Sequence, residues 1–184
     1  MPRKFWTVSN LLSISRVLFV LPSSYLIITD ARLYRWEIVS LILLASITDY
    51  LDGFFARKFK QVTEIGKILD PVADKIAIAI LCFALLLVGK LSIWFCAVVI
   101  LRDLAIMIGS VHIMKIKKVT AQSNWIGKWT VTIFALYILS LIILSDDRSL
   151  LQSGLQVISL IMIIVSFISY LRRYLAQVRS VQKQ

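Results

Sequence analysis

The sequence predicts an all-α integral membrane protein, a bundle of six transmembrane helices that forms one domain over residues 1–184. Hydrophobic residues make up 59% of the chain and its mean hydropathy is +0.86, whereas roughly 45–50% of a soluble domain is apolar. Six apolar stretches each approach the ~20 residues that a helix needs to cross a bilayer. No segment alternates apolar and polar residues with period two, which favours a helical bundle over a barrel.

The apolar stretches define the expected spans in chain order. They are Asn10–Thr29, Glu37–Phe55, Pro71–Gly89, Ser92–Met114, Gly127–Ser145 and Leu150–Leu171. We expect the first to be retained as a helix, because Arg16 and Pro22 interrupt the apolar core that a cleaved signal peptide needs. Cys82 and Cys96 fall inside the third and fourth spans, so we expect buried thiols rather than a disulfide framework.

The basic residues predict an orientation. With six spans and a cytoplasmic N-terminus, fourteen lysines and arginines fall at cytoplasmic span ends and four in outer loops. This bias follows the positive-inside rule and places both termini in the cytoplasm, in a protein of the cell (inner) membrane. The net charge of +11 is spread over several turns, which fits anionic lipid headgroups and gives no reason to expect a nucleic-acid partner.

Acidic residues inside the spans are the candidate functional groups. An ionised side chain at mid-helix costs ~2.5–3.5 kcal/mol on insertion scales, so several of them need an explanation. Asp49 and Asp52 are three residues apart, and Asp70 and Asp74 are four apart, so each pair shares a helix face. Counting ~1.5 Å per residue from the cytoplasmic ends puts the two pairs at similar depths, about 10–12 Å below the surface. We therefore expect the four aspartates to converge.

Four converging carboxylates need cations, because like charges in one site raise each other's pKa. An all-oxygen ligand set favours Mg²⁺ or Mn²⁺ over zinc or copper. Two such ions would bind a diphosphate and neutralise the charge that develops on its leaving group. This chemistry suits a nucleotide-linked lipid approached from the cytoplasm.

Three alternatives to a metal site would also place aspartates in these spans. Asp70 followed by Pro71 is typical of a helix N-cap, which accounts for one of the four residues. A cation or proton transporter also needs buried carboxylates, although it gives no reason for the glycine and arginine spacing around them. A membrane scaffold without catalytic activity is the third alternative.

A longer motif surrounds the aspartates and resembles a known family. It reads Asp49-Tyr50-Leu51-Asp52-Gly53-Phe54-Phe55-Ala56-Arg57, then eight residues, Gly66, three residues, Asp70, three residues and Asp74. This pattern matches in full the signature of the CDP-alcohol phosphotransferase family. The similarity extends from Asn10–Arg16 in the first span to Trp125–Lys128 before the fifth, which covers most of the chain.

The resemblance implies a six-helix enzyme that works as a homodimer and binds two divalent metal ions. It implies that Asp49, Asp52, Asp70 and Asp74 hold the metals and that Asp74 also takes the proton of the attacking hydroxyl. The nucleotide-binding positions that it implies are Gly53, Ala56, Arg57 and Gly66. Small residues at two of these positions also fit close helix packing.

Within the family, the sequence is most similar to bacterial phosphatidylglycerophosphate synthases. The implied reaction moves the phosphatidyl group of CDP-diacylglycerol to glycerol 3-phosphate, giving phosphatidylglycerophosphate and CMP. Two departures favour a cardiolipin synthase with phosphatidylglycerol as acceptor. Asp103 follows Arg102 where the glycerophosphate enzymes typically have glutamate, and Ser110 stands where they tend to carry a second arginine. The first span also departs, with Ser9-Asn10 and Leu12-Ser13 where Pro-Asn-x-Leu-Thr is common.

Four basic residues are candidates for binding the glycerol-based acceptor. Lys117, Lys118 and Lys128 lie at the expected cytoplasmic mouth, where they would serve either an acceptor phosphate or membrane anchoring. Arg102 lies deeper and would either reach the acceptor, as the resemblance implies, or pair with Asp103. His112 is expected to be a packed or interfacial residue rather than a catalyst.

Overall fold

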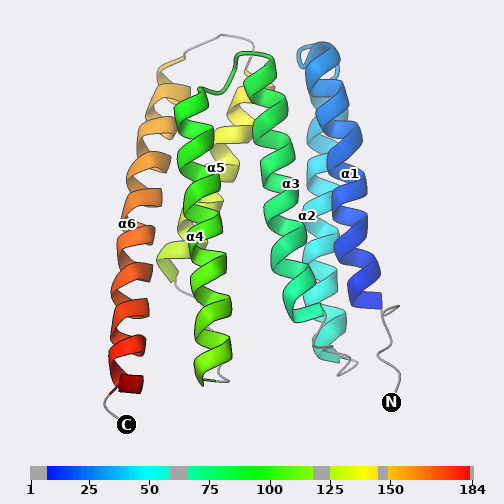
Figure 1. Cartoon of the computed structure of the whole chain (residues 1–184). Helices are drawn as coiled ribbons and strands as arrows, with labels where there is room; N and C mark the ends of the chain where they lie inside the picture. The colour runs from blue at the N-terminus through cyan, green and yellow to red at the C-terminus, as the bar shows by residue number, and fades with distance from the viewer. Residues whose placement is uncertain (1–7, 59–65, 118–124, 145–148, 183–184) are drawn as a thin grey trace. The chain divides into compact units, whose positions relative to one another are not determined.

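The computed structural model describes residues 8–58, 66–117, 125–144 and 149–182. Within these ranges, the side chains of residues 8–14, 49–50, 52–58, 66–71, 114–117 and 180–182 lie outside the description. Every regular element in the described ranges is an α-helix, which confirms the all-α prediction there (Figure 1). The helices are α1 (Val8–Asp30), α2 (Arg35–Lys58), α3 (Gly66–Leu87), α4 (Ile93–Lys117), α5 (Trp125–Ile143) and α6 (Leu150–Gln182).

The observed helices follow the expected spans to within a few residues at most ends. Two ends differ more: α3 begins at Gly66, ahead of the expected Pro71, and α6 continues past Leu171 to Gln182. Among the described residues, three segments are long and apolar enough to cross a membrane, namely Ile93–Ile113, Trp125–Ile143 and Leu150–Arg179. They indicate a membrane protein, and membrane crossing by α1, α2 and α3 stays a prediction.

The helices fall into two compact units. The first, Met1–Ile93, contains α1, α2 and α3, and the second, Trp94–Gln184, contains α4, α5 and α6. The prediction of a single domain over residues 1–184 is not decided by this division. Cys82 and Cys96 are buried free thiols, as predicted.

In the first unit, a tight turn joins α1 to α2. Asp30 ends α1, and its Oδ1 accepts hydrogen bonds from the backbone N–H groups of Arg32 (2.9 Å) and Leu33 (3.0 Å). The N–H of Tyr34 donates to the carbonyl of Asp30 at 3.1 Å. An aspartate that bonds the backbone two and three residues ahead stabilises a turn, so this reversal is encoded locally.

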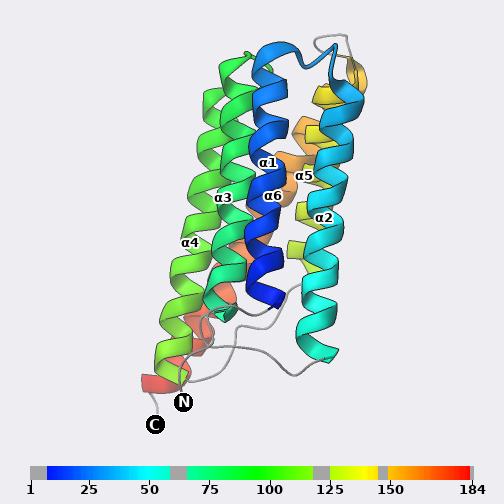
Figure 2. The same cartoon turned by 90° about the vertical axis from the view of Figure 1, so that its right-hand side faces the viewer.

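The three helices of the first unit meet at a core of small and branched residues. α1 lies between α2 and α3 and contacts both (Figure 2). Val20, Ala45 and Ala77, one from each helix, form a buried cluster against which Phe19, Ile80 and Leu81 pack. The two alanines allow close approach of helices, which is how transmembrane helices gain packing energy in lipid.

A glycine ends α3. Gly89 has a φ of +72°, and its N–H bonds the carbonyl of Leu86 at 3.0 Å while the N–H of Lys90 bonds the carbonyl of Leu85 at 3.0 Å. This pair of bonds is a Schellman motif, in which glycine adopts the left-handed conformation without steric cost. Leu91, in the turn between α3 and α4, is buried.

In the second unit, polar groups fix the start of α6 against α5. Ser149 and Gln152 form a capping box, in which each side chain accepts the backbone N–H of the other at 3.2 Å. The Gln152 amide also donates to the carbonyl of Ser140 on α5 at 3.3 Å. Further along, the Thr130 hydroxyl lies 3.2 Å from the carbonyl of Met162. Two contacts between α5 and α6 are therefore side chain to backbone.

Tyr170 connects α6 to α4. Its hydroxyl donates to the carbonyl of Ile106 at 3.0 Å and lies 3.2 Å from Ser110 Oγ. Gly109 makes room for this ring, because a Cβ there would lie 2.6 Å from the Tyr170 hydroxyl oxygen. Polar contacts and a small residue thus replace the hydrophobic drive that is missing between helices in lipid.

We expect Gly109→Ala to lower the midpoint of thermal unfolding of the detergent-solubilised protein. The added methyl group must displace Tyr170 and break its two hydrogen bonds, at a cost of about 1–3 kcal/mol. Gly154→Ala on α6 is the matched control, because nothing lies within 4 Å of a Cβ there and alanine favours the helix. Adding Tyr170→Phe to Gly109→Ala should recover part of the loss. An unchanged midpoint in Gly109→Ala would contradict this account of the α4–α6 contact.

Candidate active site

The one acidic motif residue with a described side chain, Asp74, forms an ion pair between helices. Its Oδ1 contacts Nη1 of Arg16, so α3 is joined to α1. The arginine is buried, with 5% of its surface exposed, whereas the side chain of Asp74 is 44% exposed. A buried guanidinium stays ionised and needs a counter-charge, and the aspartate supplies it. The exposed part of the carboxylate remains accessible to a ligand.

The position of this pair follows from the packing of the first unit. Val20 comes four residues after Arg16, and Ala77 comes three residues after Asp74. Residues at these spacings share a helix face. The buried cluster that contains Val20 and Ala77 therefore places Arg16 and Asp74 near each other, one turn along their helices. The apolar cluster therefore sets the helix register that the ion pair requires.

The structure places the other motif residues on α2 and α3. Asp49, Asp52, Gly53, Ala56 and Arg57 belong to α2, while Gly66 and Asp70 belong to α3. All of their side chains lie outside the described part of the chain.

The start of α3 tests whether Asp70 is the N-cap of its helix. Because α3 begins at Gly66, four residues before Asp70, that aspartate is not the N-cap of its helix. Helix capping therefore does not account for Asp70.

A metal site is compatible with the part of the motif that the structure describes. Among the described side chains, no three His, Cys, Asp or Glu residues cluster as metal ligands, and three of the four predicted ligands fall outside that set. Asp74 itself fits, since a half-exposed carboxylate oxygen is the donor that Mg²⁺ and Mn²⁺ prefer.

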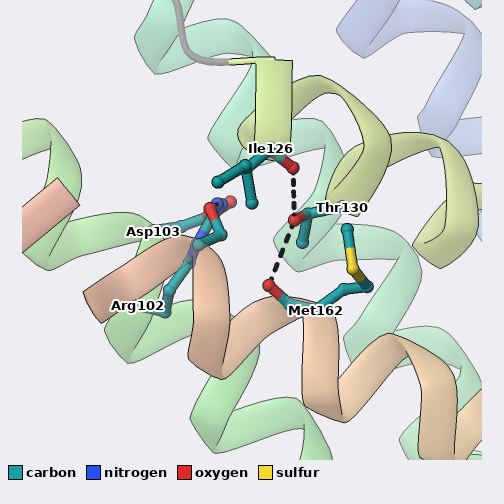
Figure 3. Close-up of polar contacts among 6 residues, drawn as sticks. Arg102, Asp103, Ile126, Thr130 and Met162 are labelled. Atoms are coloured by element: carbon teal, nitrogen blue, oxygen red, sulfur yellow. Dashed lines mark hydrogen bonds and ion pairs between the residues drawn. The ribbon is translucent and has the colours of Figure 1, made fainter. Parts of the chain in front are cut away.

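Arg102 lies in the second unit and is held by polar contacts. Its Nη1 lies 2.6 Å from Oδ1 of the buried Asp103, and its Nη2 donates to Ser166 Oγ on α6 at 2.6 Å. Figure 3 shows the pair beside the first turn of α5, near Ile126 and Thr130. The contact with Asp103 is therefore present in the structure, and a role in acceptor binding stays a prediction.

The remaining candidates have ordinary surroundings or lie outside the description. Lys128 is exposed, and its Nζ sits 5.3 Å from the ring centroid of Trp125, as a residue at a membrane interface would. The side chain of Lys117 and all of Lys118 lie outside the described residues. His112 is exposed, and its Nδ1 lies 2.9 Å from the Tyr174 hydroxyl; its expected place as a packed or interfacial residue stays a prediction.

Sequence reasoning missed the partner of Arg16. The signal was present, because an arginine inside an apolar span needs a counter-charge and Asp74 was among the few acidic residues at membrane depth. The contacts of Ser166 and Tyr170 across α4 and α6 had no comparable signal, since serine and tyrosine are common in transmembrane helices.

Comparison with known proteins confirms the family resemblance. The sequence model of the CDP-alcohol phosphatidyltransferase family matches residues 6–171. The chain is 34% identical over 169 residues to the CDP-diacylglycerol--glycerol-3-phosphate 3-phosphatidyltransferase of Aquifex aeolicus, with 89% of this chain and 93% of the relative covered. Proteins of the same name from Rickettsia bellii and Mycoplasma genitalium are 30% and 33% identical, over 76% and 66% of this chain and 76% and 58% of the relatives. The chain belongs to the CDP-alcohol phosphatidyltransferase family.

Proposed function

We propose that this protein is a metal-dependent phosphatidyltransferase. It moves the phosphatidyl group of CDP-diacylglycerol to glycerol 3-phosphate and yields phosphatidylglycerophosphate and CMP. The family match and the names of its relatives support the reaction. The observation that carries the site is the ion pair in which buried Arg16 holds the last aspartate of the motif.

The proposed metal ligands are Asp49, Asp52, Asp70 and Asp74. The packing of the first unit supports this set, because Ala45 of the buried cluster precedes Asp49 by four residues and Ala77 follows Asp74 by three. Positions at these spacings share a helix face, so both aspartates belong one turn from the same cluster. When bound, two Mg²⁺ or Mn²⁺ ions would supply charge neutralisation at the phosphates of the liponucleotide.

The proposed base is Asp74. The acceptor hydroxyl oxygen forms a bond to the β-phosphorus, the bond from that phosphorus to the CMP oxygen breaks, and the hydroxyl proton passes to the Asp74 carboxylate. Arg16 is a positioning residue in this scheme, since it holds one carboxylate oxygen and leaves the side chain half exposed. Gly53, Ala56, Arg57 and Gly66 are proposed to receive the cytidine nucleotide.

We infer six membrane spans with both termini in the cytoplasm, an active site that faces the cytoplasm from the inner membrane, and a homodimer. The three apolar helices of the second unit and the charge bias of the sequence support the topology. We propose that the acceptor phosphate is bound by four basic residues, Arg102, Lys117, Lys118 and Lys128.

A second candidate acceptor is phosphatidylglycerol, which would make the protein a cardiolipin synthase. One contact favours it. Ser110, where related glycerophosphate enzymes tend to have arginine, packs in the structure against the Tyr170 hydroxyl at 3.2 Å. A position used for helix packing provides no cation for an acceptor phosphate.

A competition assay decides between the acceptors. Purified full-length protein would receive labelled CDP-diacylglycerol, Mg²⁺ and equal amounts of glycerol 3-phosphate and phosphatidylglycerol. We expect labelled phosphatidylglycerophosphate and CMP as products, and no turnover after chelation of the metal. Formation of cardiolipin alone would overturn the proposed acceptor, and turnover that survives complete metal removal would overturn the metal site.

Replacing Asp74 by asparagine tests the proposed base and ligand. Asp74→Asn keeps the size and a hydrogen-bond acceptor for Arg16 but removes its counter-charge, so the unfolding midpoint should fall while the protein stays folded at assay temperature, and turnover should fall about 10²- to 10⁴-fold. Asp30→Asn is a matched control, because an amide oxygen can still accept the two backbone N–H groups of the α1–α2 turn. Near-normal turnover in Asp74→Asn would remove this residue as the base.

Variants of Arg16 test its positioning role. Arg16→Lys keeps the charge, and Arg16→Gln removes it, so we expect kcat to fall at least ~10-fold in the glutamine variant and to be partly restored by lysine. The KM for CDP-diacylglycerol should change less than kcat, because Arg16 acts through Asp74 rather than on the substrate. Arg35→Gln provides a control for the loss of one charge, at the start of α2. Equal activity of the lysine and glutamine variants would show that the charge of Arg16 has no part in positioning Asp74.

A further inference from the structure

A pocket of about 440 Å³ lies between α5 and α6. Its lining consists of Ile126, Val165, Ile168, Ser169, Arg172 and Arg173. Branched apolar side chains form the wall, and two adjacent arginines follow at one end, one turn beyond Ile168 on α6. The pocket therefore has an apolar part and a cationic part, and it contains neither Arg16 nor Asp74.

The two arginines are available to a ligand. Both are exposed, and neither makes an ion pair or a hydrogen bond with the part of the chain that the structure describes. Arg102 in the same unit shows the contrast, since Asp103 and Ser166 hold its guanidinium. Adjacent guanidinium groups without a counter-charge among the described residues favour an anion, and arginine suits phosphate oxygens because of its planar set of donors.

The cationic end lies at the depth of lipid phosphates. Arg172 lies about 33 Å along α6 from Leu150, at ~1.5 Å per residue, and the hydrocarbon core of a bilayer is ~30 Å thick. Trp125 begins α5 about one turn closer to the bilayer centre, since Thr130 bonds the carbonyl of Met162 and Gly127 lies against Ser166, and 74% of the Trp125 surface is exposed. Exposed tryptophans at a helix end are typical of the membrane–water interface. The apolar wall thus faces acyl-chain depth and the arginines face headgroup depth.

We propose that the α5–α6 pocket binds an anionic phospholipid of the surrounding bilayer. The lipid phosphate contacts Arg172 and Arg173, and an acyl chain lies along Ile126, Val165 and Ile168. Charge complementarity selects the headgroup, and the apolar wall excludes a free phosphate ion as the preferred occupant, because such an ion would leave that wall in contact with water. The site is separate in its residues from the proposed chemistry and does not depend on it.

The test compares two lipids that differ in headgroup charge. Full-length protein in detergent would be titrated with dioleoyl-phosphatidylserine or dioleoyl-phosphatidylcholine, and bound lipid would be counted by native mass spectrometry. Neither lipid is a substrate or product of the reactions considered above. We expect phosphatidylserine to bind about 30-fold more tightly, as two interfacial arginines would provide. Inorganic phosphate should not displace it.

Three variants locate the binding. Arg172→Gln with Arg173→Gln should abolish the preference for phosphatidylserine, and Val165→Trp should weaken its binding about tenfold by filling the apolar wall. Arg32→Gln with Arg35→Gln removes the same charge outside the pocket and should leave the preference intact. Unfolding midpoints identify any variant that fails to fold. If Val165→Trp fails to fold, the double variant of Arg172 and Arg173 still tests the proposal, because both of these side chains are exposed.

Several results would overturn the proposal. These are equal binding of the two lipids by the wild-type protein, an undiminished preference in the Arg172 and Arg173 double variant, and displacement of phosphatidylserine by inorganic phosphate. An equal loss of preference in the control variant at Arg32 and Arg35 would also overturn it, because general charge attraction would then explain the binding.

Discussion

The buried guanidinium of Arg16 is the constraint on which the first unit depends. Inside an apolar bundle a guanidinium requires a carboxylate within reach, and Asp74 on α3 provides it. The requirement restricts how α1 and α3 rotate and slide against each other. The buried cluster of Val20, Ala45 and Ala77 satisfies the same restriction through close packing. Packing and electrostatics therefore select one helix register, and that register presents the last motif aspartate half exposed.

In the second unit, the ion pair lies within one helix, and hydrogen bonds link that helix to α6. Here Arg102 finds its carboxylate on the neighbouring residue, Asp103, and uses its second donor to reach Ser166 on α6. Tyr170 reaches back from α6 to α4, where Gly109 leaves room for its ring. Because lipid provides no hydrophobic drive between helices, such hydrogen bonds and small residues decide which helices associate.

The predictable parts of this fold are the ones that depend on local sequence. Hydropathy located all six helices, and local chemistry explains several ends, such as the Ser149 and Gln152 capping box and Gly89 after α3. The early start of α3 at Gly66 was not predicted, since Asp70 followed by Pro71 is a common N-terminal signal. Pairing of Arg102 with the neighbouring Asp103 was one of the two alternatives that the sequence offered. The contacts of Arg16 with Asp74 and of Arg102 with Ser166 depend on helix rotation and on residues distant in sequence, which a pattern along one helix does not contain. Convergence of the four aspartates stays a prediction of the motif.

The contacts of α4 bear on how an acceptor could be chosen. A soluble phosphorylated acceptor needs cations that are free to bind it, whereas a lipid acceptor can gain binding energy from apolar surface. On α4, Arg102 is engaged by Asp103 and Ser166, and Ser110 packs against Tyr170. If glycerol 3-phosphate is the acceptor, as the relatives' names favour, its phosphate must either displace Ser166 from the guanidinium or bind lysines near the helix ends. The first route predicts that removal of the Ser166 hydroxyl, by Ser166→Ala, would release one arginine donor and lower the KM for glycerol 3-phosphate.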